Sequence, residues 1–400
     1  MNGEFDILIA GGGMVGLTIA LSLSQCDAND QLRITVVDAG ERPSFSPGQD
    51  VSLRVSAIAA GTASLLDRLG AWDSIAGTRA CPYHNMRVWD ATGSVEGPET
   101  LHFDAAEFAV PELGFIVENI LIQDALLAAL DTTNVSLNYA TRIRSVQKSG
   151  NRHVVTYGDG ETAKPDLVIG ADGASSFVRN SAGITVKSWK YSQTAFVTHL
   201  QPESNHRNTA WQRFLKNGPI ALLPLSDGRV STVWTTTPEL AQELTDATDE
   251  QLASLLTDAT DGVLGKLSVS GPRGAFPLKS QHANRYVLEG LVLAGDAAHA
   301  VHPLAGQGAN LGLADARVLA DVIAGALAAG EHPGDLPVLR RYERARKVAN
   351  KSMLYFIDGL NRLFSNESAP LARLRGAGMA LFNKSGPIRA YAVQVALGIR

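Results

Sequence analysis

The sequence predicts an α/β protein with three parts: a parallel sheet covered by helices, an inserted and mostly antiparallel sheet, and helices at the C-terminal end. Three observations lead to this prediction. The chain starts with a strand, a glycine-rich turn and a helix. Two later apolar strands each end beside a glycine and an aspartate. Between those two strands, polar and apolar residues alternate as in a half-buried sheet.

The composition fits a globular protein that is large enough to enclose a ligand. Of 400 residues, 45% are hydrophobic and 19% are charged, and no long apolar run predicts a membrane-spanning helix. The first residues lack the basic and apolar parts of a signal peptide, so we expect a cytoplasmic protein. Cys26 and Cys81 have the spacing of neither a metal site nor a disulfide framework. The net charge of −5 gives no reason to expect a nucleic-acid partner.

The N-terminal segment FDILIAGGGMVGLTIALSLSQ has the pattern of a dinucleotide-binding turn. The apolar residues 5–10 predict a buried parallel strand. Gly11 permits the tight turn, Gly13 lets a pyrophosphate approach the backbone, and Gly16 lets helix and strand pack closely. The next strand, RITVVDAG, contains Asp38 at the place where an acid can bond ribose hydroxyls. This unit predicts a Rossmann-like nucleotide site, but it does not choose between NAD and FAD.

Two later strands lead into turns that fit the same site. Residues 167–171 are apolar and precede Asp172 and Gly173, although an Asp-Gly pair after a strand is also a common turn. Residues 291–294 precede a glycine and Asp296, which can accept hydrogen bonds from a polyol such as ribitol. The next loop and helix contain residues that suit a flat ring: Pro303, Gly306, Gln307, Gly308 and Asn310. A helix N-terminus directed at a flavin stabilises its anionic reduced ring, so this segment favours FAD over NAD.

The order of these segments predicts the domain organisation. The chain between the second and third nucleotide segments contains alternating stretches such as ALLPLSDGRVSTVWTTT, with an Asp-Gly turn between two predicted strands. We therefore expect a discontinuous FAD-binding domain, an inserted β-rich substrate domain and a helical C-terminal region. The expected ranges are 1–75, 100–184 and 281–340 for the FAD-binding domain, 76–99 and 185–280 for the substrate domain, and 341–400 for the C-terminal region.

In this order, the three segments resemble the flavoprotein hydroxylases built like 4-hydroxybenzoate hydroxylase. Within that group, four stretches look like the ubiquinone-biosynthesis FAD-dependent monooxygenase family, which includes the polyprenylphenol hydroxylases. They are LRVSAIAAGTASLLDRLGAW, ELGFIVENILIQDALL, GPIALLPLSDGRVSTVW and AGDAAHAVHPLAGQGANLGLADA. The similarity extends from residue 5 to about residue 364. It implies FAD as the cofactor and NAD(P)H as the electron donor.

On the adenosine side of the cofactor, the resemblance implies roles for five residues. Gly11, Gly13 and Gly16 would hold the FAD pyrophosphate. Asp38 would bind the adenosine ribose, where the family often has the longer Glu. Gln123 matches a position on the helix beside the adenosine part, which is often Arg in relatives.

On the ring side, the resemblance implies a second group of contacts. Arg54 would lie near the pyrophosphate and the path of the nicotinamide. Asp172 and Gly173 would serve both FAD and NAD(P)H, and Asp296 would bind the ribityl chain. Pro303 would lie near the carbon that carries the peroxide, and the residues expected along the isoalloxazine ring are Gly306, Gln307, Gly308 and Asn310. Of all these residues, the ones expected to act in catalysis are Arg54, Pro303, Gly306 and Gln307.

The resemblance also implies a reaction. NAD(P)H or another donor reduces FAD, which reacts with O2 to form a C4a-hydroperoxide, and a prenylated phenol takes up the distal oxygen inside a dry cavity. Neither a metal nor a Ser-His-Asp nucleophile is required. Rival interpretations are a hydroxylase of a soluble aromatic acid, a flavin halogenase, which lacks its tryptophan-rich signature here, and a non-catalytic FAD-binding scaffold of a biosynthetic complex.

Two groups of residues near the predicted site leave alternatives open. His299 and His302 border the ring site, where they act either as acid and base or as braces of the loop. Aromatic residues of the inserted sheet either line the substrate cavity or belong to its ordinary core. These are Tyr191, Trp211, Phe214 and Trp234.

The C-terminal region is strongly basic. Residues 340–400 contain twelve Lys or Arg and three acids, a net charge of +9, which leaves −14 for residues 1–339. From Leu339 to Phe364, apolar residues recur at helical spacing with basic residues between them. This region either packs on the domain, or rests on anionic lipid at the inner face of the membrane, or contacts an acidic partner subunit. The sequence leaves the oligomeric state open, with a homo-oligomer among the options.

Overall fold

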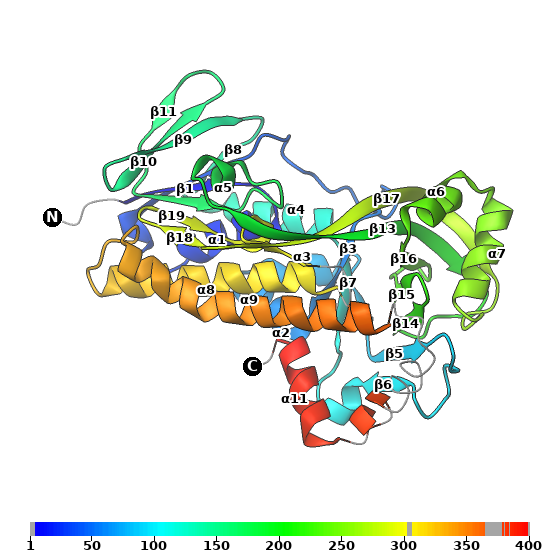
Figure 1. The fold of residues 1–400 in the computed structure, drawn as a ribbon. Helices are drawn as coiled ribbons and strands as arrows, with labels where there is room; N and C mark the ends of the chain where they lie inside the picture. The colour runs from blue at the N-terminus through cyan, green and yellow to red at the C-terminus, as the bar shows by residue number, and fades with distance from the viewer. Residues whose placement is uncertain (1–4, 302–305, 365–377, 380, 384, 399–400) are drawn as a thin grey trace.

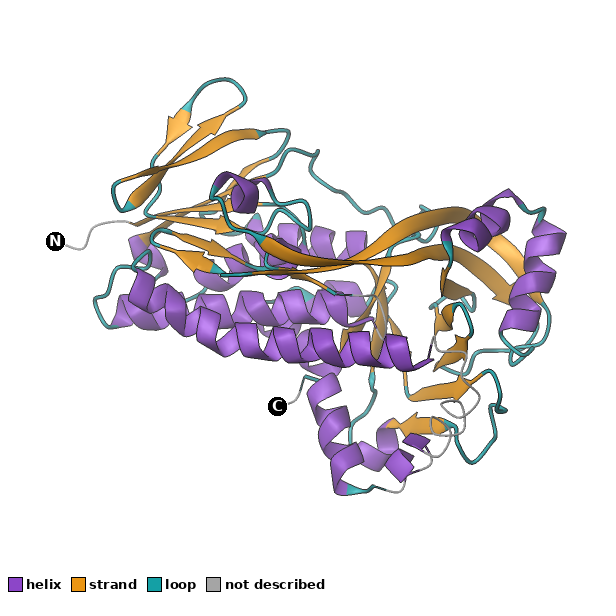
Figure 2. Cartoon of the chain, in the orientation of Figure 1, coloured by secondary structure: helices purple, strands orange, loops and turns teal. Residues whose placement is uncertain are grey.

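The computed structural model describes residues 5–301, 306–364, 378–379, 381–383 and 385–398. Two sheets lie at opposite ends of the molecule, and the long strands β13 (Val186–Pro202) and β17 (Leu267–Ala283) run from one end to the other (Figure 1). Two long helices, α8 (Gln307–Ala328) and α9 (Leu336–Phe364), lie side by side along the same direction (Figure 2). The arrangement confirms the predicted α/β fold with an inserted, mostly antiparallel sheet and C-terminal helices.

The first sheet has six strands in the order β18-β19-β12-β1-β2-β8. All neighbours are parallel except β18 and β19. The strands are β1 (Phe5–Ala10), β2 (Leu32–Val37), β8 (Ser136–Asn138), β12 (Leu167–Gly170), β18 (Val287–Leu288) and β19 (Leu291–Leu293). The apolar runs form buried strands because helices cover both faces of such a sheet. The strands predicted from these runs are therefore confirmed.

Four helices pack beside this sheet, either on its strands or on one another. They are α1 (Met14–Ser24), α4 (Asn119–Leu130), α8 (Gln307–Ala328) and α9 (Leu336–Phe364). The helix α1 contacts both α4 and α8, and its residues from 16 to 21 are all buried. On its other side, α8 packs on α9. The predicted helix in the basic region is thus confirmed as α9, and part of that helix packs on the domain.

The second sheet has eight strands in the order β20-β17-β13-β16-β15-β14-β5-β6. It is antiparallel except where β14 pairs in parallel with β5. The strands are β5 (Asn85–Asp90), β6 (Leu101–Asp104), β13 (Val186–Pro202), β14 (Thr209–Leu215), β15 (Gly218–Pro224), β16 (Val230–Thr236), β17 (Leu267–Ala283) and β20 (His299–Ala300). The predicted hairpin is confirmed, since β15 and β16 pair around a turn in which Gly228 has a φ of +89°.

Smaller elements complete the structure. One three-stranded sheet consists of β3 (Val55–Ala59), β7 (Gly114–Glu118) and β4 (Cys81–Tyr83), and another of β9 (Ile143–Ser149), β10 (Arg152–Tyr157) and β11 (Thr162–Ala163). The remaining helices are α2 (Ala60–Arg68), α3 (Trp72–Ala76), α5 (Phe177–Ser181), α6 (Pro238–Asp246), α7 (Asp249–Ala259) and α11 (Pro387–Ala396). Within the described ranges, no helix is long and apolar enough to cross a membrane. The exact domain boundaries stay a prediction.

A buried carboxylate on α8 connects the first sheet to both long helices. Asp315 has no exposed surface, and one of its oxygens accepts hydrogen bonds from Nε2 of His299 at 2.5 Å and from the backbone N–H of Gly295 at 3.1 Å. Its other oxygen accepts from Nε of Arg346 at 2.6 Å and from Nδ2 of Asn350 at 3.0 Å. Burial alone raises the pKa of Asp315, but His299 and Arg346 outweigh it and lower the pKa to about 2.

Asp315→Asn should destabilise the protein strongly. The substitution removes the charge that compensates the buried Arg346 guanidinium, and breaking a buried ion pair in this way costs about 3–5 kcal/mol. Urea unfolding at neutral pH measures the loss, with Asp321→Asn on the exposed face of α8 as the control. Because the folded pKa lies below the ordinary value of 3.8, the stabilisation is complete above that value and disappears as the pH falls through about 2. A cost under about 1 kcal/mol would contradict the role given to Asp315.

Candidate active site

The predicted glycine turn lies between β1 and α1. Gly11 has a φ of +110°, and a Cβ atom there would collide with the carbonyl oxygen of Ala171. A Cβ atom on Gly16 would collide with the carbonyl oxygen of Gly11. At Gly13, by contrast, a Cβ atom would meet nothing within 4 Å among the described residues. Gly13 also begins α1 without a side-chain cap, so the first N–H groups of the helix are open to an anion.

A cavity of about 450 Å³ extends from this turn to the inserted sheet. Its size falls in the usual range for small-molecule sites. One wall is formed by backbone of the glycine turns and by two charged side chains, and the other by residues of β14, β15 and β16. Six of the predicted site residues line it: Gly13, Arg54, Gly173, Asp296, Gly306 and Gly308. The cavity therefore brings together segments separated by nearly three hundred residues of sequence.

The two charged groups of the cavity wall influence each other. Arg54 is exposed to the cavity, and its guanidinium has no hydrogen bond or ion pair with any residue that the structure describes. Asp296 also faces the open space, while the protein around it raises the pKa of its carboxyl above the ordinary value through desolvation. The charges of His299 and Arg54 act in the opposite direction and favour the carboxylate.

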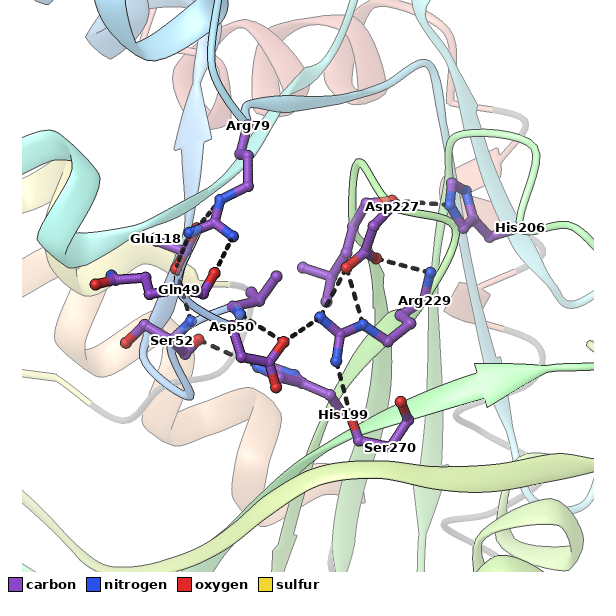
Figure 3. A network of polar contacts seen from close by, with 12 residues as sticks. Gln49, Asp50, Ser52, Arg79, Glu118, His199, His206, Asp227, Arg229 and Ser270 are labelled. Atoms are coloured by element: carbon purple, nitrogen blue, oxygen red, sulfur yellow. Dashed lines mark hydrogen bonds and ion pairs between the residues drawn. The ribbon is translucent and has the colours of Figure 1, made fainter. Parts of the chain in front are cut away.

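The segment that precedes Arg54 is held by a network of polar contacts from the small sheet of β3, β7 and β4 and from the inserted sheet (Figure 3). Asp50 accepts a hydrogen bond from Arg229, beside β16, at 2.6 Å. The N–H of Ser52 donates to Glu118, at the end of β7, at 2.6 Å, and its carbonyl accepts from Nε2 of His199, on β13, at 3.1 Å. These bonds fix the backbone that presents Arg54 to the cavity.

A buried ion pair supports the same network. Arg79 contacts the Glu118 carboxylate at 3.0 Å and donates to the carbonyl of Gln49 at 2.8 Å (Figure 3). Both side chains of the pair are largely buried. Burial also lowers the pKa of His199, so at neutral pH the imidazole is uncharged and donates its Nε2–H to the carbonyl of Ser52. None of these contacts was predicted, because they join residues that carry no shared sequence pattern.

Three predicted cofactor residues lie beside the cavity and not in its wall. Asp38 accepts a hydrogen bond from the N–H of Gly12 at 2.6 Å, so it braces the glycine turn. One oxygen of Asp172 accepts from the N–H of Val178 at 3.0 Å, while its other oxygen is buried without a partner. Gln123 is partly buried on α4. Their contacts with FAD stay a prediction.

The start of α8 separates this cavity from a second one. Gly306 begins the helix with a φ of +63°, and a Cβ atom there would lie 2.8 Å from that of Ala57. Asn310 joins the helix to β3, since its Oδ1 accepts from the N–H of Ala59 at 2.9 Å and its Nδ2 donates to the carbonyl of Ala57 at 2.8 Å. Gln307 and Asn310 line the second cavity. Pro303 lies outside the described residues.

The aromatic residues of the inserted sheet divide between the two interpretations. Trp211 lines the first cavity, and Phe214 lines the second. Trp234 is buried in the core between the sheet and helices α6 and α7. The side chain of Tyr191 lies outside the described part of the structure. Trp211 therefore fits the interpretation that these aromatic residues line the substrate cavity. Trp234 fits the interpretation that they belong to the ordinary core of the sheet.

The histidines and Asp315 show what the sequence motifs left out. His299 is almost fully buried and bonds Asp315, as expected of a brace. His302 lies outside the described residues. Asp315 was not predicted, although a single acid on the buried face of an apolar helix indicates that a buried partner must exist. That partner, Arg346, comes from the basic region, for which the sequence predicted apolar packing or a surface contact but no buried ion pair.

Comparison with known proteins places the chain in a family. A family model described as an FAD binding domain matches residues 4–356. The chain is 37% identical to 3-demethoxyubiquinol 3-hydroxylase of Escherichia coli K12, with all of both chains covered. It is 39% identical to the ubiquinone hydroxylase UbiL of Rhodospirillum rubrum, over 98% of this chain and 89% of that protein. The chain belongs to the ubiquinone-biosynthesis FAD-dependent monooxygenase family.

Solved structures agree with the fold of this monooxygenase. The p-nitrophenol 4-monooxygenase PnpA of Pseudomonas putida DLL-E4 superposes with a TM-score of 0.79 at 19% identity, over 100% of this chain and 99% of that one. The residues present fit FAD. The open N-terminus of α1 suits the pyrophosphate, Asp296 suits a polyol, and the uncapped N-terminus of α8 lies beside the cavity where the ring would be held.

Asp296→Ala should yield protein depleted of its yellow cofactor. Loss of a charged hydrogen-bond acceptor for the ribityl hydroxyls weakens binding by about 1.5–3 kcal/mol, which corresponds to roughly ten- to hundredfold. The flavin absorbance of purified protein and the FAD dissociation constant of the apoprotein measure the effect. Asp159→Ala, on an exposed turn far from the cavity, is the control. Full FAD occupancy in the Asp296 variant would refute the assignment.

Proposed function

We propose that this monooxygenase hydroxylates the aromatic ring of a prenylated phenol in ubiquinone biosynthesis. The observation that carries the proposal is the cavity itself, in which cofactor-binding turns face a largely apolar wall of the inserted sheet. Residues of that wall include Trp211, Pro219, Leu223 and Val233. The names of the bacterial relatives, a demethoxyubiquinol hydroxylase and a ubiquinone hydroxylase, support the substrate class.

FAD supplies the redox chemistry, with NAD(P)H as electron donor and O2 as oxygen source. The protein binds, orients and excludes water. The N–H groups at Gly13 would hold the pyrophosphate, Asp296 the ribityl chain, and the segment from Gly306 to Gly308 the ring. Arg54 adds positive charge near the ring and the approach of the nicotinamide. Trp211 offers a flat apolar surface on which a phenol can lie, and it helps to keep the cavity dry.

The cavity suits a prenylated phenol better than a soluble aromatic acid. A carboxylate substrate needs a cation of its own inside the site. Among the described residues that line the cavity, Arg54 is the only cation, and it lies on the cofactor side close enough to influence Asp296. A non-catalytic scaffold would not need an enclosed apolar wall beside the cofactor turns.

Purified holoenzyme should consume NAD(P)H faster when a prenylated phenol is added, and should place one oxygen atom from labelled O2 in the product. Mass spectrometry of the product measures the incorporation and identifies the hydroxylated carbon. Substituted benzoates serve as the comparison. Hydroxylation of a benzoate but of no prenylated phenol would favour the soluble-acid function, and tight FAD without substrate-dependent NAD(P)H oxidation would favour a scaffold.

We also propose that the enzyme reaches its lipid-soluble substrate by resting on an anionic membrane. On α9, residues spaced three or four apart form one exposed stripe that alternates basic and apolar side chains: Arg344, Val348, Lys351 and Tyr355. Val348 is 70% exposed, and Leu381 in the following region is 72% exposed. Exposed apolar residues beside basic ones are typical of surfaces that bind anionic lipid.

The double variant Val348→Asp, Leu381→Asp should bind anionic liposomes at least severalfold less than the unmodified protein, because each change replaces an exposed apolar side chain with a negative charge that anionic lipid repels. Co-sedimentation with vesicles of phosphatidylglycerol and phosphatidylcholine measures it. Leu255→Asp, at the exposed position on α7 at the far end of the molecule, is the matched control. Equal binding by all three proteins, insensitive to salt, would overturn the membrane proposal.

A further inference from the structure

A second cavity of about 640 Å³ lies on the other side of the first turn of α8. It is enclosed by α2, α8, α9 and α11, and its wall is mainly apolar. The apolar and small residues that line it include Leu65, Leu311, Ala314, Ala349, Met353, Phe356, Ile357 and Val395. Its volume is within the range of small-molecule sites, and Gln307 and Asn310 are the predicted cofactor residues among the described residues that line it. Arg317 and Arg346 also line it, but the predominance of apolar side chains makes the cavity suitable for an apolar chain.

One residue lines both cavities. Gln212, on β14, is only 8% exposed, and its side chain makes no hydrogen bond with any residue that the structure describes. Because the side chain faces both cavities, its amide is free to bond a polar group of a ligand that lies at their junction. The neighbouring residues also alternate between the cavities: Gly308 faces the first, while Gln307 and Asn310 face the second. Gln212 and this helical turn form the junction.

The second cavity is also close to the surface. Phe356 and Tyr391, on its α9 and α11 walls, are 61% and 57% exposed. The helix α11 is fixed there by a hydrogen bond from the N–H of Gly61 to the carbonyl of Leu397 at 2.8 Å and by an ion pair of Arg389 with Glu107 at 2.7 Å. The cavity therefore extends from exposed aromatic residues of α9 and α11 to Gln212, which also lines the ring cavity.

We propose that the two cavities form one substrate site, in which the first holds the aromatic ring, the second holds the isoprenoid tail, and the Gln212 amide binds an oxygen substituent of the ring at the junction. This assignment rests on the proposed function and adds to it the place of the tail. It makes the helices α9 and α11 a determinant of tail length. It also makes Gln212 a residue that orients the aromatic ring of the substrate within the first cavity.

The assignment is tested by measuring how two ligands bind to the FAD-loaded enzyme. One ligand is a methoxyphenol that carries a farnesyl chain, and the other is the same methoxyphenol with a methyl group instead of the farnesyl chain. Calorimetry in matched detergent gives both dissociation constants, and product analysis gives turnover. The unmodified enzyme should bind the farnesyl ligand more than tenfold tighter, because each buried CH2 strengthens binding about fourfold. Ala349→Trp should remove most of that preference and leave the methyl ligand unaffected, because the indole occupies the space of the tail.

Ala345→Trp, one turn earlier on the exposed part of α9 and outside the cavity wall, is the matched control and should retain the preference. Ala314→Phe narrows the same space from α8 and covers the case in which Ala349→Trp does not fold. Gln212→Leu should weaken both ligands by roughly five- to tenfold, since both carry the ring oxygen.

The outcomes separate the two proposals. If the enzyme hydroxylates both ligands and both cavity-filling variants keep the farnesyl preference, the tail lies elsewhere and the assignment fails while the proposed function stands. If Gln212→Leu binds both ligands normally, the amide does not contact the ring substituent. If the unmodified enzyme binds and hydroxylates neither ligand, the proposed function and the assignment fail together.

Discussion

The bonds of the Asp315 carboxylate hold the site together. Through two oxygens it joins the backbone N–H of Gly295, the imidazole of His299, and the side chains of Arg346 and Asn350. These partners belong to the turn that carries Asp296, to the edge strand β20 of the inserted sheet, and to α9. A buried carboxylate is tolerable only because all these partners surround it. The same bonds fix the position of α8 relative to the turn at Gly295. Because residues of α8 line both cavities, this position also affects the shape of each cavity.

The two sheets contribute different properties to one cavity. The parallel sheet supplies turns whose exposed N–H groups and charges suit a nucleotide, whereas the inserted sheet supplies apolar side chains. Arg54 lies beside this cavity, and its position depends on the small sheet and on the inserted sheet: Glu118 and Arg79 hold the preceding segment from the side of the small sheet, while Arg229 and His199 hold it from the inserted sheet. A change in either layer would therefore alter the cation beside the cofactor.

Local patterns were enough to predict the parallel strands, the glycine turn and the hairpin around Gly228. In each case the structure follows from a short stretch of residues: apolar runs make buried strands, and glycine takes the positive φ that the turn requires. The pairing of β14 with β5, the Asp315 cluster and the second cavity depend instead on residues that meet only after folding. The bonds of the Asn310 amide to β3 are another such long-range contact, and the predicted contact of Asn310 with the flavin ring stays a prediction.

The order of strands in the parallel sheet has a consequence for biosynthesis. The partner of β1 on one side is β12, about 160 residues later, and β19 completes that side only after a further 120 residues. Contacts so distant in sequence are slow to form, since a long loop must close before they stabilise anything. A ribosome-bound chain exposes the apolar edge of β12 until nearly three quarters of the protein has been made. The nascent protein therefore carries an unpaired apolar edge during most of its synthesis, and the turns expected to hold FAD are complete only after α8 has begun.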